Sequence, residues 1–332
     1  MKKFKDACLI NPYICIVRSL HLRLLITLTA LIVSGLASAQ QSSFSKSHVA
    51  QHTEFTYKWR NHGKEYQLNF GIDTATLYAM PPSPPNYSQK VFQDNVYLKV
   101  MYAASQIDAT LANIDIKKNH SGLSFNVSSR QPKQAQRVLN KLKLAHDQAQ
   151  DDYWSENFFL KYTSPAGADG IRHDHAKYTV LSSPSLKPIV DAISKLQSNS
   201  NDPQEFIEIA LGWIQSIPYD RLEDRLSSNG AGFLSPRDLL LQNQGDCDSK
   251  STLMAALLKA YSSRADVQMV FLPEHALLAV NMRGVTGDMT LNYKGQEYVL
   301  LEPTGPAQLP LGEVADSSKL SLRNRQFDLS TL

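Results

Sequence analysis

The residue with the clearest chemical potential in this chain is Cys247, which begins a segment whose pattern predicts a buried helix. Leucine and alanine recur at three- and four-residue intervals over 253–260, so the helix would have an apolar face. Asp246, just before the cysteine, is a residue type that caps helix starts. A thiol at the positive end of a helix is favoured as the thiolate, the form that attacks carbonyl carbon. Asp246 and Asp248 act against this effect, and Lys250 offsets them in part.

A histidine and a carboxylate follow the cysteine in an order that suits thiol catalysis. His275 begins the β-rich run 275–281, and Glu302 follows the β-rich run 297–301. A thiol needs a base within hydrogen-bond reach, and the same base can then protonate the leaving group. The imidazole needs an acceptor on its other nitrogen, which a carboxylate supplies. Each residue alone also fits an ordinary structural role, but together they predict a Cys-His-Glu triad.

The first 39 residues have the pattern of a secretory signal peptide. Basic residues precede an apolar run over 24–33, and a small-residue site, Ala-Ser-Ala, ends at Ala39. An uncleaved membrane anchor is the alternative, but the run is short of the ~20 apolar residues that span a bilayer. We therefore expect cleavage after Ala39 and a periplasmic or secreted protein with no membrane span.

Removal of this segment changes the charge and the cysteine count of the chain. It takes away five basic residues and one acidic residue, which leaves 29 Lys and Arg against 30 Asp and Glu. A nearly neutral protein lacks the basic footprint of a nucleic-acid binder. Two of the three cysteines lie within residues 1–39, so Cys247 would be a lone thiol outside the reducing cytosol, either buried or used.

The pattern predicts a smaller amino-terminal α+β unit over 40–165, whose role the sequence does not indicate. A hairpin is expected across 54–72, a strand at 123–127 and a helix after Pro132. Residues 91–116 mix strand and helix spacing, and the pattern does not decide between them.

A second unit is expected over 166–315, after a small-residue stretch at the boundary. Amphipathic helices are predicted at 186–196 and 203–216, ahead of the cysteine helix, and strands follow from residue 267 onward. The last segment, 316–332, is polar with little periodicity, which predicts a loosely docked tail.

Two further groups of residues raise functional alternatives. Aromatic residues crowd into 153–162 and could line a peptide groove, although core packing is the commoner role at such spacing. His173 and His175 have the alternate spacing of metal ligands on a strand. No third ligand is identifiable by spacing, so we expect a surface loop there and no metal.

Calcium is the one cofactor that the sequence raises. Hard oxygen ligands occur near the cysteine and the histidine of the predicted triad: Asp220, Asp246, Asp248 and Glu274. Acidic residues at helix starts are common for dipole reasons alone. We therefore expect no cofactor and keep calcium as an alternative.

Four pieces of the second unit resemble the transglutaminase-like superfamily, in its bacterial cysteine-peptidase branch. They are IPYD at 217–220, GFLSPRDL at 232–239, GDCDSK at 245–250, and EHALLAV at 274–280 followed by LLEPTG at 300–305. The resemblance covers about residues 170–312. It implies a papain-like α+β core, with the nucleophile helix packed on an antiparallel sheet.

The resemblance also implies roles for individual residues. Cys247 matches the nucleophile, His275 the general base and acid, and Glu302 the orienting carboxylate. The family most often has Asp at the third position, so the carboxylate here extends one methylene further. Tyr219 matches a position that helps to stabilise an oxyanion together with the Cys247 backbone N–H, with a packing role as the alternative.

We therefore expect an exported thiol hydrolase that cleaves peptide or amide bonds through a thioester acyl-enzyme. Its substrate would be a protein or peptide of the cell envelope. Transglutaminase-type amine transfer uses the same intermediate, and the sequence does not distinguish the two reactions. A non-catalytic peptide-binding envelope module is the third alternative.

Overall fold

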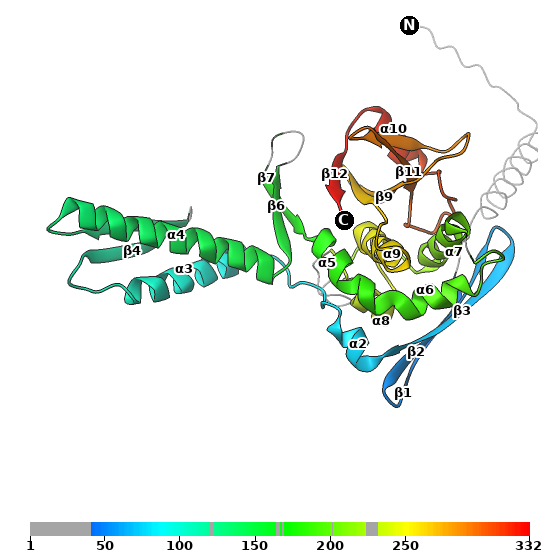
Figure 1. Cartoon of the computed structure of the whole chain (residues 1–332), viewed down its shortest axis with the longest axis horizontal. Helices are drawn as coiled ribbons and strands as arrows, with labels where there is room; N and C mark the ends of the chain where they lie inside the picture. Colours follow the sequence, from blue (N-terminus) through cyan, green and yellow to red (C-terminus); the bar gives the residue numbers. More distant parts are fainter. Residues whose placement is uncertain (1–40, 120–121, 164–166, 168, 201, 224–231) are drawn as a thin grey trace, which may run out of the picture. The chain divides into compact units, whose positions relative to one another are not determined.

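The computed structural model describes residues 41–119, 122–163, 167, 169–200, 202–223 and 232–332 (Figure 1). Within these ranges the chain is a mixed α+β protein whose sheets are antiparallel. The predicted signal peptide, residues 1–39, lies outside the described residues and stays a prediction. Over the described ranges, no helix is both long enough and apolar enough to cross a bilayer.

A three-stranded antiparallel sheet begins the described chain. Its strands are β1 (Gln41–Val49), β2 (His52–Asn61) and β3 (Lys64–Asp73). The β2–β3 pairing confirms the predicted hairpin, and Gly63 supplies a φ of 80° in its turn. Phe55, Tyr57 and Trp59 are buried at alternate positions of β2, as the two-residue period of a strand requires.

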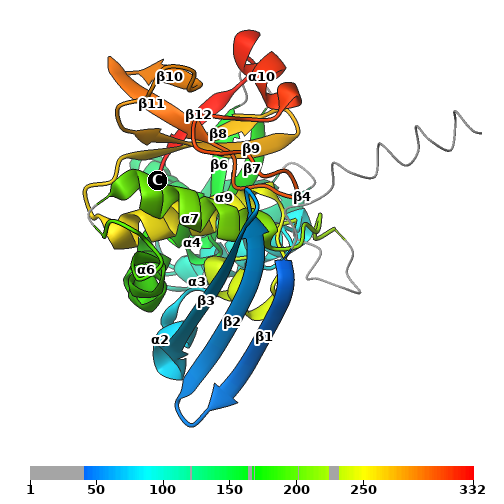
Figure 2. The same cartoon turned by 90° about the vertical axis from the view of Figure 1, so that its right-hand side faces the viewer.

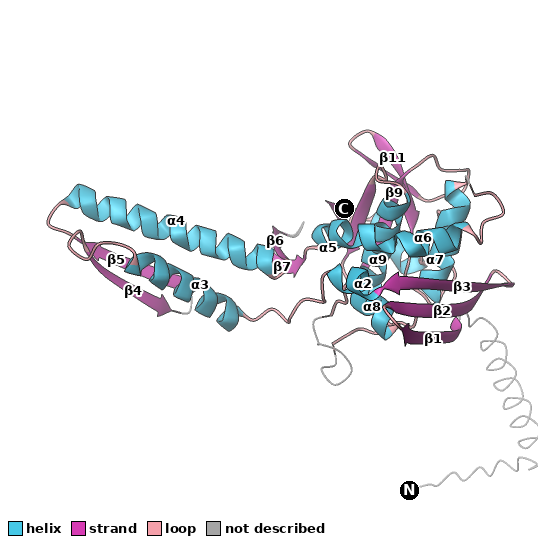
Figure 3. Ribbon diagram, turned by 60° about the horizontal axis from the view of Figure 1, so that its bottom comes forward, coloured by secondary structure: helices cyan, strands magenta, loops and turns pink. Residues whose placement is uncertain are grey.

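A second group of elements packs along one long helix. After α2 (Thr74–Ala79) come α3 (Gln89–Ser105), β4 (Asn113–Asn119), β5 (Gly122–Ser128) and α4 (Pro132–Glu156). Figure 3 shows α3 and the β4–β5 hairpin beside α4. Val96 and Val100 of α3 pack with Ala149 of α4 in a small apolar cluster. The undecided region 91–116 therefore contains most of the helix α3 and the start of the strand β4.

The helices that lead to Cys247 follow a short hairpin. The elements are β6 (Phe159–Thr163), β7 (Asp169–His173), α5 (His175–Ser182), the 3₁₀ turn η1 (Ser183–Leu186), α6 (Lys187–Ser194), α7 (Pro203–Ser216), α8 (Pro236–Gln242) and α9 (Cys247–Tyr261). Asp202 caps α7 by accepting hydrogen bonds from the backbone N–H groups of Gln204 and Glu205. The predicted helices at 203–216 and after Asp246 are confirmed.

A five-stranded antiparallel sheet completes the chain. Its strands are β8 (Val267–Leu272), β9 (His275–Asn281), β10 (Thr290–Tyr293), β11 (Gln296–Leu301) and β12 (Asp328–Thr331), in the order β10-β11-β9-β8-β12. Figure 2 shows α7 and α9 between this sheet and the three-stranded one. Strands β8 and β9 are buried on both faces, which explains their nearly continuous apolar sequence.

The final segment is not the loosely docked tail that its polarity predicts. Residues Asp316–Arg323 form α10, and β12 pairs with β8 in antiparallel register. Leu332 at the chain end is buried in the main core. The tail interpretation is therefore wrong, because strand pairing with a distant segment orders a sequence that lacks local periodicity.

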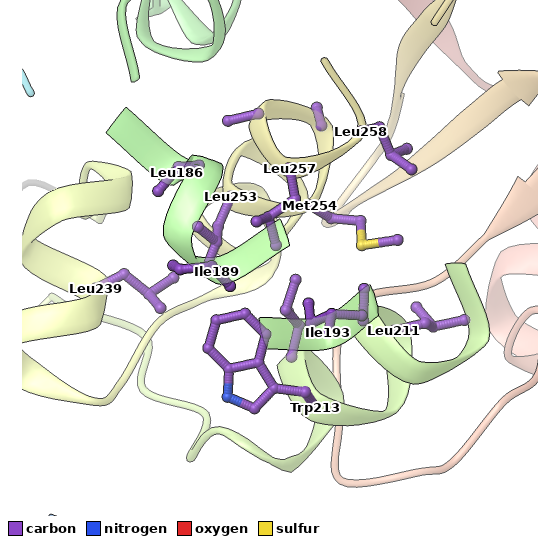
Figure 4. Close-up of a cluster of buried hydrophobic side chains, with 14 of the residues drawn as sticks. Leu186, Ile189, Ile193, Leu211, Trp213, Leu239, Leu253, Met254, Leu257 and Leu258 are labelled. Atoms are coloured by element: carbon purple, nitrogen blue, oxygen red, sulfur yellow. The ribbon is translucent and has the colours of Figure 1, made fainter. Parts of the chain in front are cut away.

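One hydrophobic core unites the first sheet with the later helices. The indole of Trp213 on α7 meets the rings of Tyr57 and Phe70, with centroids 5.2 and 6.0 Å apart. Figure 4 shows Trp213 beside side chains of α6 and α9 in the same core. The expected boundary between 40–165 and 166–315 does not divide this core, because the apolar face of β2 and β3 is buried by α7. Truncating a buried tryptophan costs about 3–5 kcal/mol.

Candidate active site

The turn before α9 is held from both sides, which fixes where Cys247 begins the helix. Asp246 caps α9 by accepting a hydrogen bond from the Ser249 N–H at 3.1 Å and another from the Ser249 hydroxyl. The same hydroxyl accepts from the Leu234 N–H at 2.7 Å. On the other side, Gly245 forms a parallel bridge with Tyr219. Three of the sequence pieces quoted above therefore meet at this turn.

The structure brings His275 and Glu302 together at one end of the sheet. Strands β9 and β11 are antiparallel neighbours, so the start of one lies beside the end of the other. His275 Nε2 lies 2.8 Å from Glu302 Oε1, and Glu302 is only 4% exposed. Glu302 Oε2 accepts hydrogen bonds from the Ala315 N–H at 2.9 Å and the Ser318 hydroxyl at 3.4 Å. The longer Glu side chain therefore reaches the imidazole and has its own partners.

The first turn of α9, which begins at Cys247, packs against the start of β9. The Ser251 hydroxyl on α9 donates a hydrogen bond to the backbone carbonyl of Ala276, the residue after His275, at 3.4 Å. Because Glu302 takes Nε2 of His275, Nδ1 is the ring nitrogen left for the thiol. The three predicted residues thus gather at the junction of α9 and the five-stranded sheet.

The electrostatic state of Cys247 differs from the expected thiolate. Burial, followed by the nearby Asp248 and Asp246 carboxyls, raises the pKa of the thiol to about 12. Hydrogen bonds from Ala276 and from the Asp248 backbone act the other way and are outweighed. The prediction of a lowered pKa is therefore wrong. At neutral pH the thiol is protonated, and a base must take its proton during attack.

A buried histidine contacts the residue that follows this cysteine. The sequence pattern predicted a surface loop for it. His175 begins α5, is 4% exposed, and has its Nε2 2.9 Å from Asp248 Oδ2. Burial, with the neighbouring Arg172, lowers the pKa of His175 to about 4, so a neutral ring donates to Asp248. The surface-loop expectation fails because Phe233, distant in sequence, packs edge-on against the His175 ring at 5.1 Å.

The acidic residues near the site contact each other. Burial, followed by the charge of Asp248, raises the pKa of the Asp246 carboxyl, and burial also raises that of Asp248. Two close carboxyls in a buried setting cannot both ionise easily. In the part of the chain that the structure describes, no three His, Cys, Asp or Glu residues are grouped to hold a metal ion.

Lys250 connects the cysteine helix to the end of α7. It is fully buried, and its ammonium donates a hydrogen bond to the backbone carbonyl of Ile217, the residue that ends α7. Burial lowers the pKa of Lys250 to about 7, while Asp246 acts in the opposite direction. Lys250 therefore joins two helices, and balancing the charge at the thiol is not its only role.

Tyr219 forms its parallel bridge with Gly245, two residues before Cys247. Burial raises the pKa of its phenol, and the Cys247 group adds to that shift. The residue is nevertheless 48% exposed. A protonated, half-exposed phenol near the start of α9 can donate a hydrogen bond to a substrate oxygen.

Gln215 is a site residue that the sequence analysis did not single out. It is 2% exposed on α7, and its amide donates to the backbone carbonyls of Glu302 at 2.9 Å and Leu309 at 2.8 Å. A Cβ on Gly305 would lie 1.9 Å from the Gln215 carbonyl oxygen, so only glycine fits there. The loop after Glu302 is thus tied to α7. A glutamine at the apolar end of the helix, next to Trp213 and Ile214, was the available signal.

Comparison of the chain with protein families, curated proteins and solved structures finds no match. The resemblance to the transglutaminase-like superfamily therefore rests on the four sequence pieces and stays an interpretation.

Proposed function

We propose that this chain is an exported thiol hydrolase that cleaves peptide or amide bonds with Cys247, His275 and Glu302. The 2.8 Å contact between His275 and Glu302, beside the start of the cysteine helix, carries the proposal. The packing of α9 on β9 supports a papain-like arrangement of the transglutaminase-like type. A protein or peptide of the cell envelope is the proposed substrate, reached after signal cleavage.

The first half-reaction forms a thioester. Nδ1 of His275 takes the thiol proton as the Cys247 sulfur attacks the carbonyl carbon, which generates a tetrahedral oxyanion. The Cys247 backbone N–H and the Tyr219 hydroxyl donate hydrogen bonds to that oxygen. The C–N bond then breaks, and His275 gives the proton to the leaving amine.

The second half-reaction returns the free enzyme. Water attacks the thioester carbon while His275 accepts one of its protons. The C–S bond breaks, the carboxylic acid leaves, and the sulfur recovers its proton. Glu302 holds the imidazole in the tautomer that both steps need and stabilises the imidazolium between them.

A non-catalytic peptide-binding module is the second candidate, and one observation favours it. The raised pKa of Cys247 makes the resting thiol a weak nucleophile. Catalysis then depends entirely on proton transfer to His275, whereas a binding module needs none. Cleavage assays separate these two functions.

The test is hydrolysis of quenched fluorescent casein by the purified protein and three variants. We expect Cys247→Ala and His275→Ala to abolish cleavage. His146→Ala is the matched control, because its side chain is 23% exposed against 22% for His275 and lies on α4. Undiminished cleavage by Cys247→Ala would refute the proposal, and casein binding without cleavage would favour the binding module. Incorporation of dansylated pentylamine in place of cleavage would indicate amine transfer.

A further inference from the structure

A cavity of about 910 Å³ is lined by neighbours of the proposed triad, although none of the three triad residues lines it. Two lining residues place it there. Asp248 follows Cys247 on α9, and Leu272 is the cross-strand partner of His275 in the β8–β9 hairpin. The cavity wall therefore includes the residue that follows the proposed nucleophile and the residue that pairs with the proposed base across the β8–β9 hairpin.

The cavity wall is largely aromatic and aliphatic. It comes from the β6–β7 hairpin, the end of β8 and the segment before β12, and includes Phe159, Tyr162, Ile171, Phe271 and Phe327. Aromatic walls favour aromatic partners in edge-on or offset contacts. Cavities of roughly 300–1,000 Å³ accommodate ligands of drug size. Such a volume is larger than a single small side chain.

The charged groups of this wall are largely matched within it. Arg172 pairs with Asp328 at 3.0 Å, and its guanidinium lies over the ring of Phe271 at 4.5 Å. Asp248 Oδ2 has His175 Nε2 as its partner at 2.9 Å, whereas Asp248 Oδ1 is buried without a hydrogen-bond partner. Arg325 also lines the cavity but is exposed, where solvent screens its charge. A charged substrate side chain would lose hydration on entering this largely apolar wall.

We propose that this cavity binds an aromatic or large aliphatic side chain of the peptide substrate, next to the bond that is cleaved. This inference rests on the proposed function, because it uses Cys247 and His275 to locate that bond. Small side chains would leave the cavity unfilled, and basic ones would lose their hydration on entering it.

The experiment measures binding without turnover. Acetylated, amidated tripeptides with the central residue Phe, Leu, Ala or Lys are titrated calorimetrically into the full protein carrying Cys247→Ala. We expect the Phe and Leu peptides to bind about tenfold or more tightly than the Ala and Lys peptides. Equal affinities for the four peptides, or binding of none, would overturn the proposal.

Variants of the cavity wall locate the binding. Ile171→Trp, on β7, fills the cavity and should weaken the Phe peptide about tenfold. Leu160→Trp is the control, because it makes a similar change on the paired strand β6 outside the cavity lining. Phe327→Ala removes an aromatic ring from the cavity wall and provides a second binding measurement if Ile171→Trp folds poorly. Unchanged binding in a folded wall variant would overturn the proposal.

Failure of this inference is distinguishable from failure of the proposed function. Selective binding that Ile171→Trp removes, in a protein that cleaves nothing, would keep the cavity assignment and end the hydrolase proposal. Cleavage that depends on Cys247, but that changes neither with the central residue nor with Ile171→Trp, would keep the hydrolase proposal and end the cavity assignment.

Discussion

His275 and Glu302 are joined by a hydrogen bond of 2.8 Å between Nε2 and Oε1, in which the imidazole donates to a carboxylate whose other oxygen is also bonded. This arrangement places the ring proton on Nε2 and leaves Nδ1 as the acceptor. Because burial keeps the Cys247 thiol protonated at neutral pH, the proposed mechanism requires that acceptor.

Glu302→Gln should lower kcat by about 10³–10⁴-fold with little change in KM, because the wrong imidazole tautomer would then face the thiol. The amide also cannot both accept from His275 and accept from the Ala315 N–H, so stability should fall by about 1–3 kcal/mol. Glu297→Gln, exposed on the same strand β11, is the control. Peptide hydrolysis and urea denaturation check both effects. Normal kcat in Glu302→Gln would show that the carboxylate does not orient the base.

Gln215→Leu should reduce both stability and kcat. Two buried carbonyls, of Glu302 and Leu309, would lose their donor, at a cost of about 1–3 kcal/mol in the free energy of unfolding. Because the Glu302 backbone would shift, kcat should fall more than KM rises. Gln204→Leu, on the exposed face of α7, controls for the substitution itself. A folded Gln215→Leu protein with unchanged kcat would mean that the residue supports stability alone.

Tyr219→Phe should lower kcat by about 10²-fold and leave KM nearly unchanged, because the hydroxyl would act on the oxyanion and not on the ground state. The fold should be unaffected, since the side chain is half-exposed. Tyr261→Phe, at the far end of α9, is the control. Equal kcat values for the two variants would assign Tyr219 to packing.

Asp248→Asn should speed alkylation of Cys247 by iodoacetamide at pH 8. The wild-type thiol has its pKa raised to about 12, so its rate should be below that of free cysteine and still climb above pH 9. Asp248 is the largest charge contribution to that shift, and removing it lowers the pKa. Asp316→Asn, on exposed α10, is the control. A wild-type rate that levels off near pH 7 would contradict the raised pKa.

The raised pKa also makes stability fall at high pH. The thiol of the unfolded chain ionises near pH 8.5, and the folded one near pH 12, so the folded state holds the proton more tightly in between. The contribution of this group is fully present below pH 8.5 and is lost as the pH rises toward 12. The difference in stability between wild type and Cys247→Ala should therefore change over that window.

Local patterns predicted the elements that carry the candidate triad. The cysteine helix is rich in leucine and alanine, β8 and β9 are nearly continuous apolar runs, and Asp246 is a recognisable cap. Residues 91–116 were ambiguous because α3 buries only Val96 and Val100 and therefore has a weak apolar stripe.

Features that depend on distant contacts could not be predicted in the same way. The small residues near 164–170 suggested a boundary, yet Thr163 and Asp169 pair across the β6–β7 hairpin. Nothing local in Asp328–Thr331 indicates its pairing with β8. The state of Cys247 likewise depends on how deeply α9 is packed, and helix position alone predicts the wrong sign of the pKa shift.

The most direct test of the central claim is mass spectrometry of the protein after rapid quenching with the p-nitrophenyl ester of acetyl-phenylalanine. The account predicts an acetyl-phenylalanyl adduct on the peptide that contains Cys247, formed at the wild-type rate in His146→Ala and far more slowly in His275→Ala and Glu302→Gln. Absence of the adduct from Cys247 at every time, or its formation at the same rate without His275, would contradict the account.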